Sequence, residues 1–489
     1  MSKLKRMGSG CAAVMCLVLA CGGGDGAGRA LVKIPVTTAS AEARSAYLEG
    51  RELQDSLLFT DAHAHFVRAT EVDPEFALAW MAVANTAPST VEFFAAMRRA
   101  VATAAGASDG ERMLVTAFEA AVNGEPAVQQ AELEKLVAAY PDDERAHNAL
   151  ATFLLGQQRY GEAAEAYRAA IAIDPGYPTP YNQLGYALRF LGDSKGAEEA
   201  FERYIELIPD QPNPYDSYAE LLMAVGRFED SIASYEKALE IDPTFVPSYI
   251  GIANNLVFLD RPAEALQTLD RLGAVVRSDA ERRQRLTWIA AVRLHEDDLE
   301  GALAAIGERF ELAEAAGDRA AMGFDLNAMG DILRHAGRLD EAEARYRESV
   351  EMIASSEATD DVREAAARNL ISERARIALE RGETTIAAGL TADYGSATKA
   401  HGINFELQQA RELAARVALA SGDPRKALFE LAHANQQDPE VLLLNARAFA
   451  AAGDPEAARA ACRQVVEFNQ LNPNLAFARP IARRMLEEL

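Results

Sequence analysis

The feature that most constrains the fold is a set of four prolines in register. Pro141, Pro175, Pro209 and Pro243 follow one another at a constant interval, and each ends a stretch of helical pattern such as "AIAIDP". Proline ends a helix because it lacks the amide N–H and its ring clashes with the preceding turn. A regular interval of about 34 residues indicates an array of repeated units that bury their apolar faces against one another.

Each interval contains the pattern of two amphipathic helices. Apolar residues recur at i, i+3, i+4 and i+7, which marks the buried face of a helix. The turn between the two helices, for example "GDSKGAEEA", supplies Gly to end the first helix and Asp to begin the second. A small residue in the first helix, Ala151, Gly185 or Ala219, allows the two helices to approach closely. No alternating pattern typical of a strand is present.

This spacing and these residue types resemble the tetratricopeptide repeat family, most clearly over residues 142 to about 279. The resemblance implies an all-α fold, an α-solenoid of helix-turn-helix repeats wound into a right-handed superhelix. Its concave groove would be lined mostly by the first helices of the repeats. Looser units follow downstream, at turns such as "AGRLDEAEARY", so we expect ten or eleven helical pairs in all.

The N-terminal pattern and the changing spacing of the repeats divide the chain into seven segments. They are a lipoprotein signal peptide (1–20), a lipid-anchored flexible linker (21–43), N-terminal repeats that become degenerate from residue 88 (44–141), the regular array (142–279), longer repeats (280–357), a degenerate helical pair (358–402), and C-terminal repeats with a capping helix (403–489).

The N-terminus carries an export pattern. A basic start, "MSKLKR", precedes the apolar stretch "CAAVMCLVLA", which is too short to cross a membrane as a finished helix. The residues "VLAC" resemble the bacterial lipobox, which implies cleavage before Cys21 and lipidation of that cysteine. An ordinary secretory signal or a retained anchor is the alternative. With Gly22 after the cysteine, we expect a lipid-anchored protein of the bacterial cell envelope, at the outer membrane and facing the periplasm or the surface.

Charge and cysteine content exclude some classes of function. The net charge of −25 repels nucleic-acid phosphates, so a role in DNA or RNA binding is not expected. After cleavage, Cys462 would be the only thiol besides the lipidated one, which excludes an intrachain disulfide and a metal site built on cysteines. Cys462 falls at an aromatic position of a second helix, so we expect a buried packing thiol.

A row of polar residues recurs at one register of the array. Asn148, Asn182 and Asp216 stand one repeat apart, at a first-helix position that the resemblance places in the groove. Amide side chains donate and accept hydrogen bonds together, which suits an extended peptide backbone. The same wall is expected to hold further candidates for a peptide groove: Gln183, Tyr186, Arg189, Glu220 and Asn254. The alternative, left open, is that these residues are solvated helix faces or brace neighbouring repeats.

No catalytic or metal-binding motif is supported. The "SYEK" of residues 234–237 matches Ser-x-x-Lys, but its Tyr235 is a packing residue of the repeat and no partner motif occurs. His63 and His65 diverge on a helix, and no glycine-rich stretch carries the Lys-Ser/Thr of a phosphate loop. We therefore expect no enzyme activity, no metal and no cofactor.

The function predicted is a lipid-anchored envelope scaffold that holds a protein or peptide partner in its groove, in envelope assembly or secretion. Membrane contact would come through the lipid anchor only. The alternative is a SusD-like glycan- or small-ligand-binding surface lipoprotein, a family that also combines an anchor with tetratricopeptide helices. For that role the chain offers two tryptophans, Trp80 and Trp288.

Overall fold

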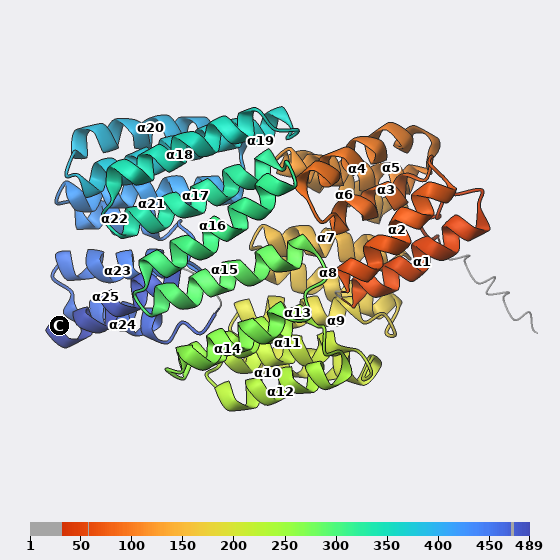
Figure 1. Cartoon of the computed structure of the whole chain (residues 1–489), viewed down its shortest axis with the longest axis horizontal. Helices are drawn as coiled ribbons and strands as arrows, with labels where there is room; N and C mark the ends of the chain where they lie inside the picture. The colour runs from red at the N-terminus through yellow and green to blue at the C-terminus, as the bar shows by residue number, and fades with distance from the viewer. Residues whose placement is uncertain (1–31, 57, 471–473) are drawn as a thin grey trace, which may run out of the picture.

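The computed structural model describes residues 32–56, 58–470 and 474–489. This part of the chain forms 25 α-helices and one short 3-10 helix, Ala104–Gly106, and it contains no strand. The all-α prediction is therefore confirmed (Figure 1). The signal peptide and Cys21 lie outside the described residues.

The first 24 α-helices form helical hairpins, each joined by a short turn. The twelve first helices are α1 Ala41–Asp55, α3 Ala77–Thr86, α5 Asp109–Val122, α7 Glu144–Gly156, α9 Thr179–Phe190, α11 Pro212–Ala224, α13 Val246–Phe258, α15 Asp279–His295, α17 Arg319–His335, α19 Asp360–Glu380, α21 Asn404–Ala420 and α23 Pro439–Ala451.

The second helices of the hairpins are α2 Phe59–Val72, α4 Thr90–Thr103, α6 Pro126–Ala139, α8 Tyr160–Ile173, α10 Ser194–Leu207, α12 Phe228–Ile241, α14 Pro262–Gly273, α16 Leu299–Ala315, α18 Leu339–Ala354, α20 Thr384–His401, α22 Pro424–Leu431 and α24 Pro455–Val466. The described residues thus hold twelve pairs rather than the ten or eleven expected.

Two residues form the turn between the two helices of a pair. Gly192 ends α9 with a φ of +79°, a left-handed conformation that residues with a Cβ rarely adopt. The next residue, Asp193, accepts a hydrogen bond from the Gly196 N–H at 2.9 Å and so caps α10. The same Gly-Asp arrangement joins α23 to α24 at Gly453 and Asp454.

Aromatic residues of the second helices fill the core of each pair. Tyr167, Phe201, Tyr235 and Tyr346 are all at most 1% exposed. Opposite Phe201, a Cβ built on Gly185 would lie 2.6 Å from the ring, so the small residue predicted there is required for this approach. In α24 the equivalent position holds Cys462, which is fully buried as expected, and burial raises the pKa of its thiol.

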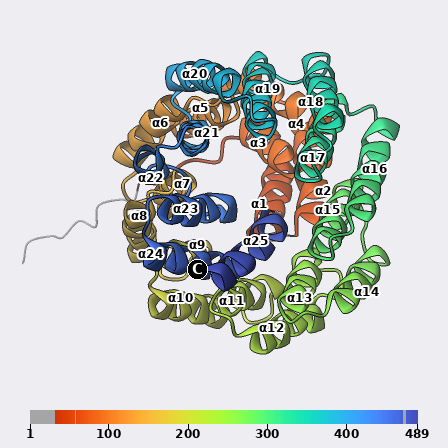
Figure 2. The ribbon, with the colours of Figure 1, turned by 90° about the vertical axis from the view of Figure 1, so that its left-hand side faces the viewer.

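The pairs wind around a central axis for more than one turn. Figure 2 shows first helices such as α13, α15 and α17 nearer the centre than α14, α16 and α18. The Thr90 N–H of the second pair donates to Asp318 of the ninth at 2.8 Å, and Asn404 of the eleventh pair donates to the Gln157 carbonyl of the fourth at 3.1 Å. One superhelical turn therefore takes seven pairs, and we call the line of contact between successive turns the seam.

Both ends of the described chain pack on this body. Residues 32–40 form no helix or strand, and the Ile34 N–H donates to Asp143 at 2.8 Å while the Thr37 N–H donates to Glu111 at 2.6 Å. The last helix, α25 (Asn474–Glu488), follows α24 but also contacts α13 and α15. It therefore joins the end of the array to its middle, besides covering the last pair.

Among the described residues, no helix has both the length and the apolar character needed to span a bilayer.

Candidate functional site on the inner surface

The predicted polar row lies on the first helices, and its last member is part of the packing. Asp216 on α11 is only 3% exposed and accepts a hydrogen bond from the Ser248 hydroxyl of α13 at 2.7 Å. Burial and the nearby Glu220 carboxylate raise the pKa of Asp216 well above its usual value. Asp216 thus braces two neighbouring repeats, which is the alternative that the sequence left open.

The amides of the row are placed differently. Asn182 is 6% exposed, and its Oδ1, like that of Asn148, is buried without a hydrogen-bond partner in the protein. Asn254 turns back on its own helix, where its Nδ2 donates to the Ile250 carbonyl at 2.8 Å. Buried amide oxygens without partners are uncommon, so Asn148 and Asn182 have capacity for a further donor.

The charged and aromatic candidates come together between α9 and α11. The Arg189 guanidinium lies 3.8 Å from the Glu220 carboxylate and 5.1 Å from the centroid of the Tyr186 ring. Gln183 is half-buried on the same helix α9. The structure therefore brings Tyr186, Arg189 and Glu220 into one cluster, and a role of the row in ligand binding stays a prediction.

A second polar cluster, which the sequence reasoning missed, lies on the first helices of the later pairs. Arg376 of α19 forms two bonds with Glu412 of α21, at 2.7 and 2.9 Å. Arg416 bonds Glu412 at 2.7 Å and reaches Glu440 of α23 at 2.5 Å. We call this cluster the polar ladder; its members are Asp331, Arg334, Glu373, Arg376, Glu412, Arg416 and Glu440.

The carboxyl groups of the polar ladder have pKa values shifted in opposite directions. Burial and the Glu373 carboxylate raise the pKa of Asp331 to about 7, against the opposing effect of Arg334. Burial also acts on Glu412, but Arg376 and Arg416 outweigh it and lower the pKa of this carboxyl to about 2. The ladder therefore contains carboxylates that stay ionised beside one that gains a proton near neutral pH.

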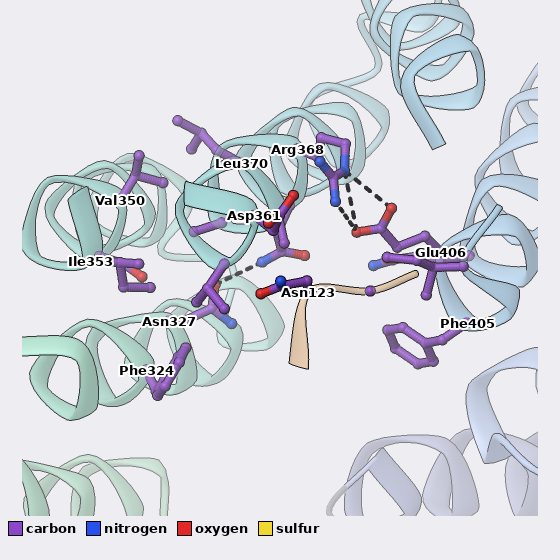
Figure 3. Close-up of a pocket in the computed structure, with 18 of the residues that line it drawn as sticks. Asn123, Phe324, Asn327, Val350, Ile353, Asp361, Arg368, Leu370, Phe405 and Glu406 are labelled. Carbon is purple, nitrogen blue, oxygen red and sulfur yellow. Dashed lines mark hydrogen bonds and ion pairs between the residues drawn. The ribbon is translucent and has the colours of Figure 1, made fainter. Parts of the chain in front are cut away.

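Two cavities lie along this surface. The first, of 340 Å³, is lined by every ladder residue except Arg416 and by amide side chains including Asn327, Asn369 and Gln409. The second, of 510 Å³, shares these three amides but is lined mainly by apolar residues, among them Phe324, Val350, Ile353, Leu370 and Phe405 (Figure 3). The turn at residues 121–124 of the first superhelical turn closes it, so we call it the seam pocket.

A sequence signal for the ladder exists, at a longer period than the one that organises the array. Asn327, Asp331 and Arg334 recur at one constant separation as Asn369, Glu373 and Arg376. The helices here are longer, 17 residues in α17 and 21 in α19, against 12 in α9. Because this separation exceeds the spacing of the four prolines, the period of the regular array does not reveal it.

No group of three or more His, Cys, Asp or Glu side chains among residues 32–56, 58–470 and 474–489 is arranged to hold a metal ion.

Comparison with protein families agrees with this architecture. Two models described as tetratricopeptide repeat match the chain, one over residues 119–178 and 412–474, the other over 154–221 and 222–287. The chain therefore contains tetratricopeptide repeats. Tetratricopeptide repeats form scaffolds for protein–protein interaction, and this array is such a scaffold.

Several solved structures are similar to parts of this tetratricopeptide array. A tetratricopeptide repeat protein from Parabacteroides merdae is 11% identical, covers 59% of this chain and 100% of its own, and has a TM-score of 0.35. A Thermus thermophilus TPR protein is 19% identical over 44% of this chain and 99% of its own, with a TM-score of 0.30. Pseudomonas aeruginosa pilF is 20% identical over 48% and 91%, with a TM-score of 0.29. A search of curated proteins finds no match.

Proposed function

We propose that this protein is a lipid-anchored scaffold of the bacterial cell envelope that binds a segment of a partner protein on its inner surface. The observation that carries the binding proposal is the continuous surface of the later pairs, where the polar ladder and the seam pocket share Asn327, Asn369 and Gln409. Polar groups that fix a ligand's orientation beside an apolar pocket are the usual arrangement of a binding site. The proposal includes no catalytic step.

The anchor part of the proposal rests on the sequence "VLAC" after a basic and an apolar stretch. An anchor would confine the scaffold near envelope partners and raise their effective concentration without new contacts. The test is metabolic labelling with an alkyne fatty acid in a bacterial host, for the natural chain and for Cys21→Ala. We expect label and membrane fractionation only for the natural chain; an unlabelled natural chain refutes the anchor.

The binding part is tested by photocrosslinking in cells. The crosslinker p-benzoylphenylalanine is placed at Phe405, which lines both cavities and is 64% exposed. The matched control is Phe429 on α22, which is 62% exposed but belongs to a second helix on the outer side. We expect a discrete protein adduct from position 405 and none from 429. If the two positions give equal amounts of adduct, or if neither gives any, the partner does not bind on the proposed surface.

A further inference from the structure

The seam pocket is a built site rather than a gap between helices. Its walls come from α17, α18, α19, α20 and α21, and the turn between α5 and α6 closes it from the neighbouring superhelical turn. That turn is tightly fitted, since a Cβ on Gly124 would lie 2.6 Å from the Ile403 Cδ1. Two exposed aromatic rings, Phe324 at 46% and Phe405 at 64%, belong to the lining. Large exposed apolar side chains at a cavity mark a surface that binds apolar groups.

The arginine in the pocket is already paired with a carboxylate. Arg368, which is 7% exposed, donates to both carboxylate oxygens of Glu406 at distances of 3.0 to 3.3 Å. Asp361 adds a second carboxylate to the lining (Figure 3). With its one lining arginine paired and an acid left over, the pocket disfavours a carboxylate or phosphate, which excludes a fatty acid or a lipid headgroup as the favoured ligand.

One buried acceptor in the pocket lacks a donor. The Oδ1 of Asn123 is buried and makes no hydrogen bond within the protein, and Figure 3 shows Asn123 reaching from the α5–α6 turn toward Asn327. A buried polar atom without a partner costs free energy, so the site is suited to a ligand that brings an N–H or O–H group.

Neighbouring amides have weakly held atoms as well. Asn369 Nδ2 donates to Asn327 Oδ1 at 2.9 Å, but their outer atoms make only long bonds, from Asn327 Nδ2 to Asp331 at 3.5 Å and from the Ser372 hydroxyl to Asn369 Oδ1 at 3.4 Å. These two amides stand where the seam pocket meets the polar ladder. One donor and one acceptor side by side match the alternating groups of an extended peptide backbone.

We propose that the seam pocket binds a large apolar side chain from an uncharged, extended segment of the partner protein, with the backbone N–H of that residue donating to Asn123 Oδ1. The flanking backbone then lies along Asn327 and Asn369 toward the polar ladder. A volume of 510 Å³ is in the range of small-ligand pockets and accommodates such a side chain with adjoining backbone. This inference rests on the proposed function and names the chemistry of the partner.

The test selects peptides with full-length protein in lipid nanodiscs, using a displayed library of short capped peptides that includes acidic, basic and uncharged members. We expect recovered peptides to be uncharged and to share one large apolar residue. Val350→Trp, which fills the pocket, should weaken their binding at least about tenfold. The matched control Ile386→Trp, at a 55% exposed position on α20, should leave it unchanged. Circular dichroism verifies that each variant folds.

The hydrogen bond to Asn123 is tested by a double-mutant cycle. A recovered peptide is N-methylated at its apolar residue, which removes the N–H and should weaken binding about tenfold to the natural protein. With Asn123→Leu the same methylation should have no effect. Acidic selected peptides, or binding indifferent to Val350→Trp, overturn the inference. If the adduct at position 405 still forms in Val350→Trp cells, the proposed function stands and only this inference fails.

Discussion

The rings of Phe477 and His335 stack in parallel, with centroids 3.7 Å apart and planes inclined by 3°. The contact joins α25 to α17, and His335 Nε2 also lies 2.9 Å from the Glu440 carboxylate of α23. One histidine therefore connects three helices of the inner surface. The last helix is held by a pair that precedes it by more than a hundred residues, so it stabilises the array beyond its own neighbour.

Removing this ring should loosen the end of the array. Phe477→Ala is expected to cost about 2 kcal/mol, because it loses a half-buried ring and a stacking contact. Amide hydrogen exchange should accelerate in α25 before it does in α9, since the units of a repeat array open locally. Phe429→Ala, at a 62% exposed position, should change the free energy of unfolding by less than about 0.5 kcal/mol. Unchanged exchange in α25 contradicts the prediction.

Gly185 should be intolerant of a methyl group. A Cβ there would lie 2.6 Å from the ring of Phe201, which is fully buried and has no room to move, so Gly185→Ala should destabilise the protein by about 2 kcal/mol. At Gly307 of α16 a Cβ meets nothing within 4 Å. Gly307→Ala should therefore stabilise by about 0.5 to 1 kcal/mol, because alanine favours a helix interior. Thermal unfolding of both variants tests this prediction. If the two substitutions change the stability in the same direction, the prediction is wrong.

The repeat architecture could be predicted because its causes are local. Prolines end the second helices, and the pair Gly192 and Asp193 ends one helix and starts the next whatever the rest of the chain does. Gly185 opposite Phe201 follows from the same period. Each of these features lies within one repeat unit, so the spacing of the four prolines is sufficient to locate them in the sequence.

The candidate site was only partly predictable, since it depends on contacts between units. The register placed Asp216 on the first helix, but not its burial or its hydrogen bond with Ser248 of the next repeat. The seam joins residues such as Thr90 and Asp318, which are 228 positions apart and share no local pattern. Asn123 reaches the seam pocket for the same reason, because a superhelical turn of seven pairs brings it there.

Stability should depend on pH through Asp331. The pKa of this carboxyl is about 7 in the folded protein, above its ordinary value, because of burial and Glu373. The folded state then binds more protons than the unfolded state, so the contribution is fully present below about pH 4 and is lost as the pH rises through 7.

Asp331→Asn removes this titration. The variant should be more stable than the natural protein at pH 8.5, by about 2 kcal/mol, and the difference should shrink as the pH falls toward 5. Denaturant unfolding at several pH values measures it. Asp393→Asn, an exposed change on α20, should leave the pH profile unaltered. A constant difference between Asp331→Asn and the natural protein across this range would falsify the assignment.

Asp318 should stabilise the protein more than an ordinary helix cap does, because it accepts hydrogen bonds from residues on both sides of the seam. It is 3% exposed, its Oδ1 accepts from the Ala321 N–H at 3.0 Å to cap α17, and its Oδ2 accepts from the Thr90 N–H at 2.8 Å. Asp298 supplies the matched control, since it caps α16 through Gly301 at 2.9 Å without a seam contact. Asp298→Ala should cost about 1 kcal/mol, the usual value of a cap.

Asp318→Ala should cost about 3 kcal/mol, because it also leaves the Thr90 N–H without its acceptor at the seam. The loss should not be confined to α17: hydrogen exchange should accelerate in α4 as well, although α4 belongs to a pair seven positions earlier in the array. Asp298→Ala should leave exchange in α4 unchanged. If the two variants lose equal stability and α4 stays protected in both, the seam bond does not stabilise the stacking of successive turns, and the seam pocket that depends on this stacking loses its support.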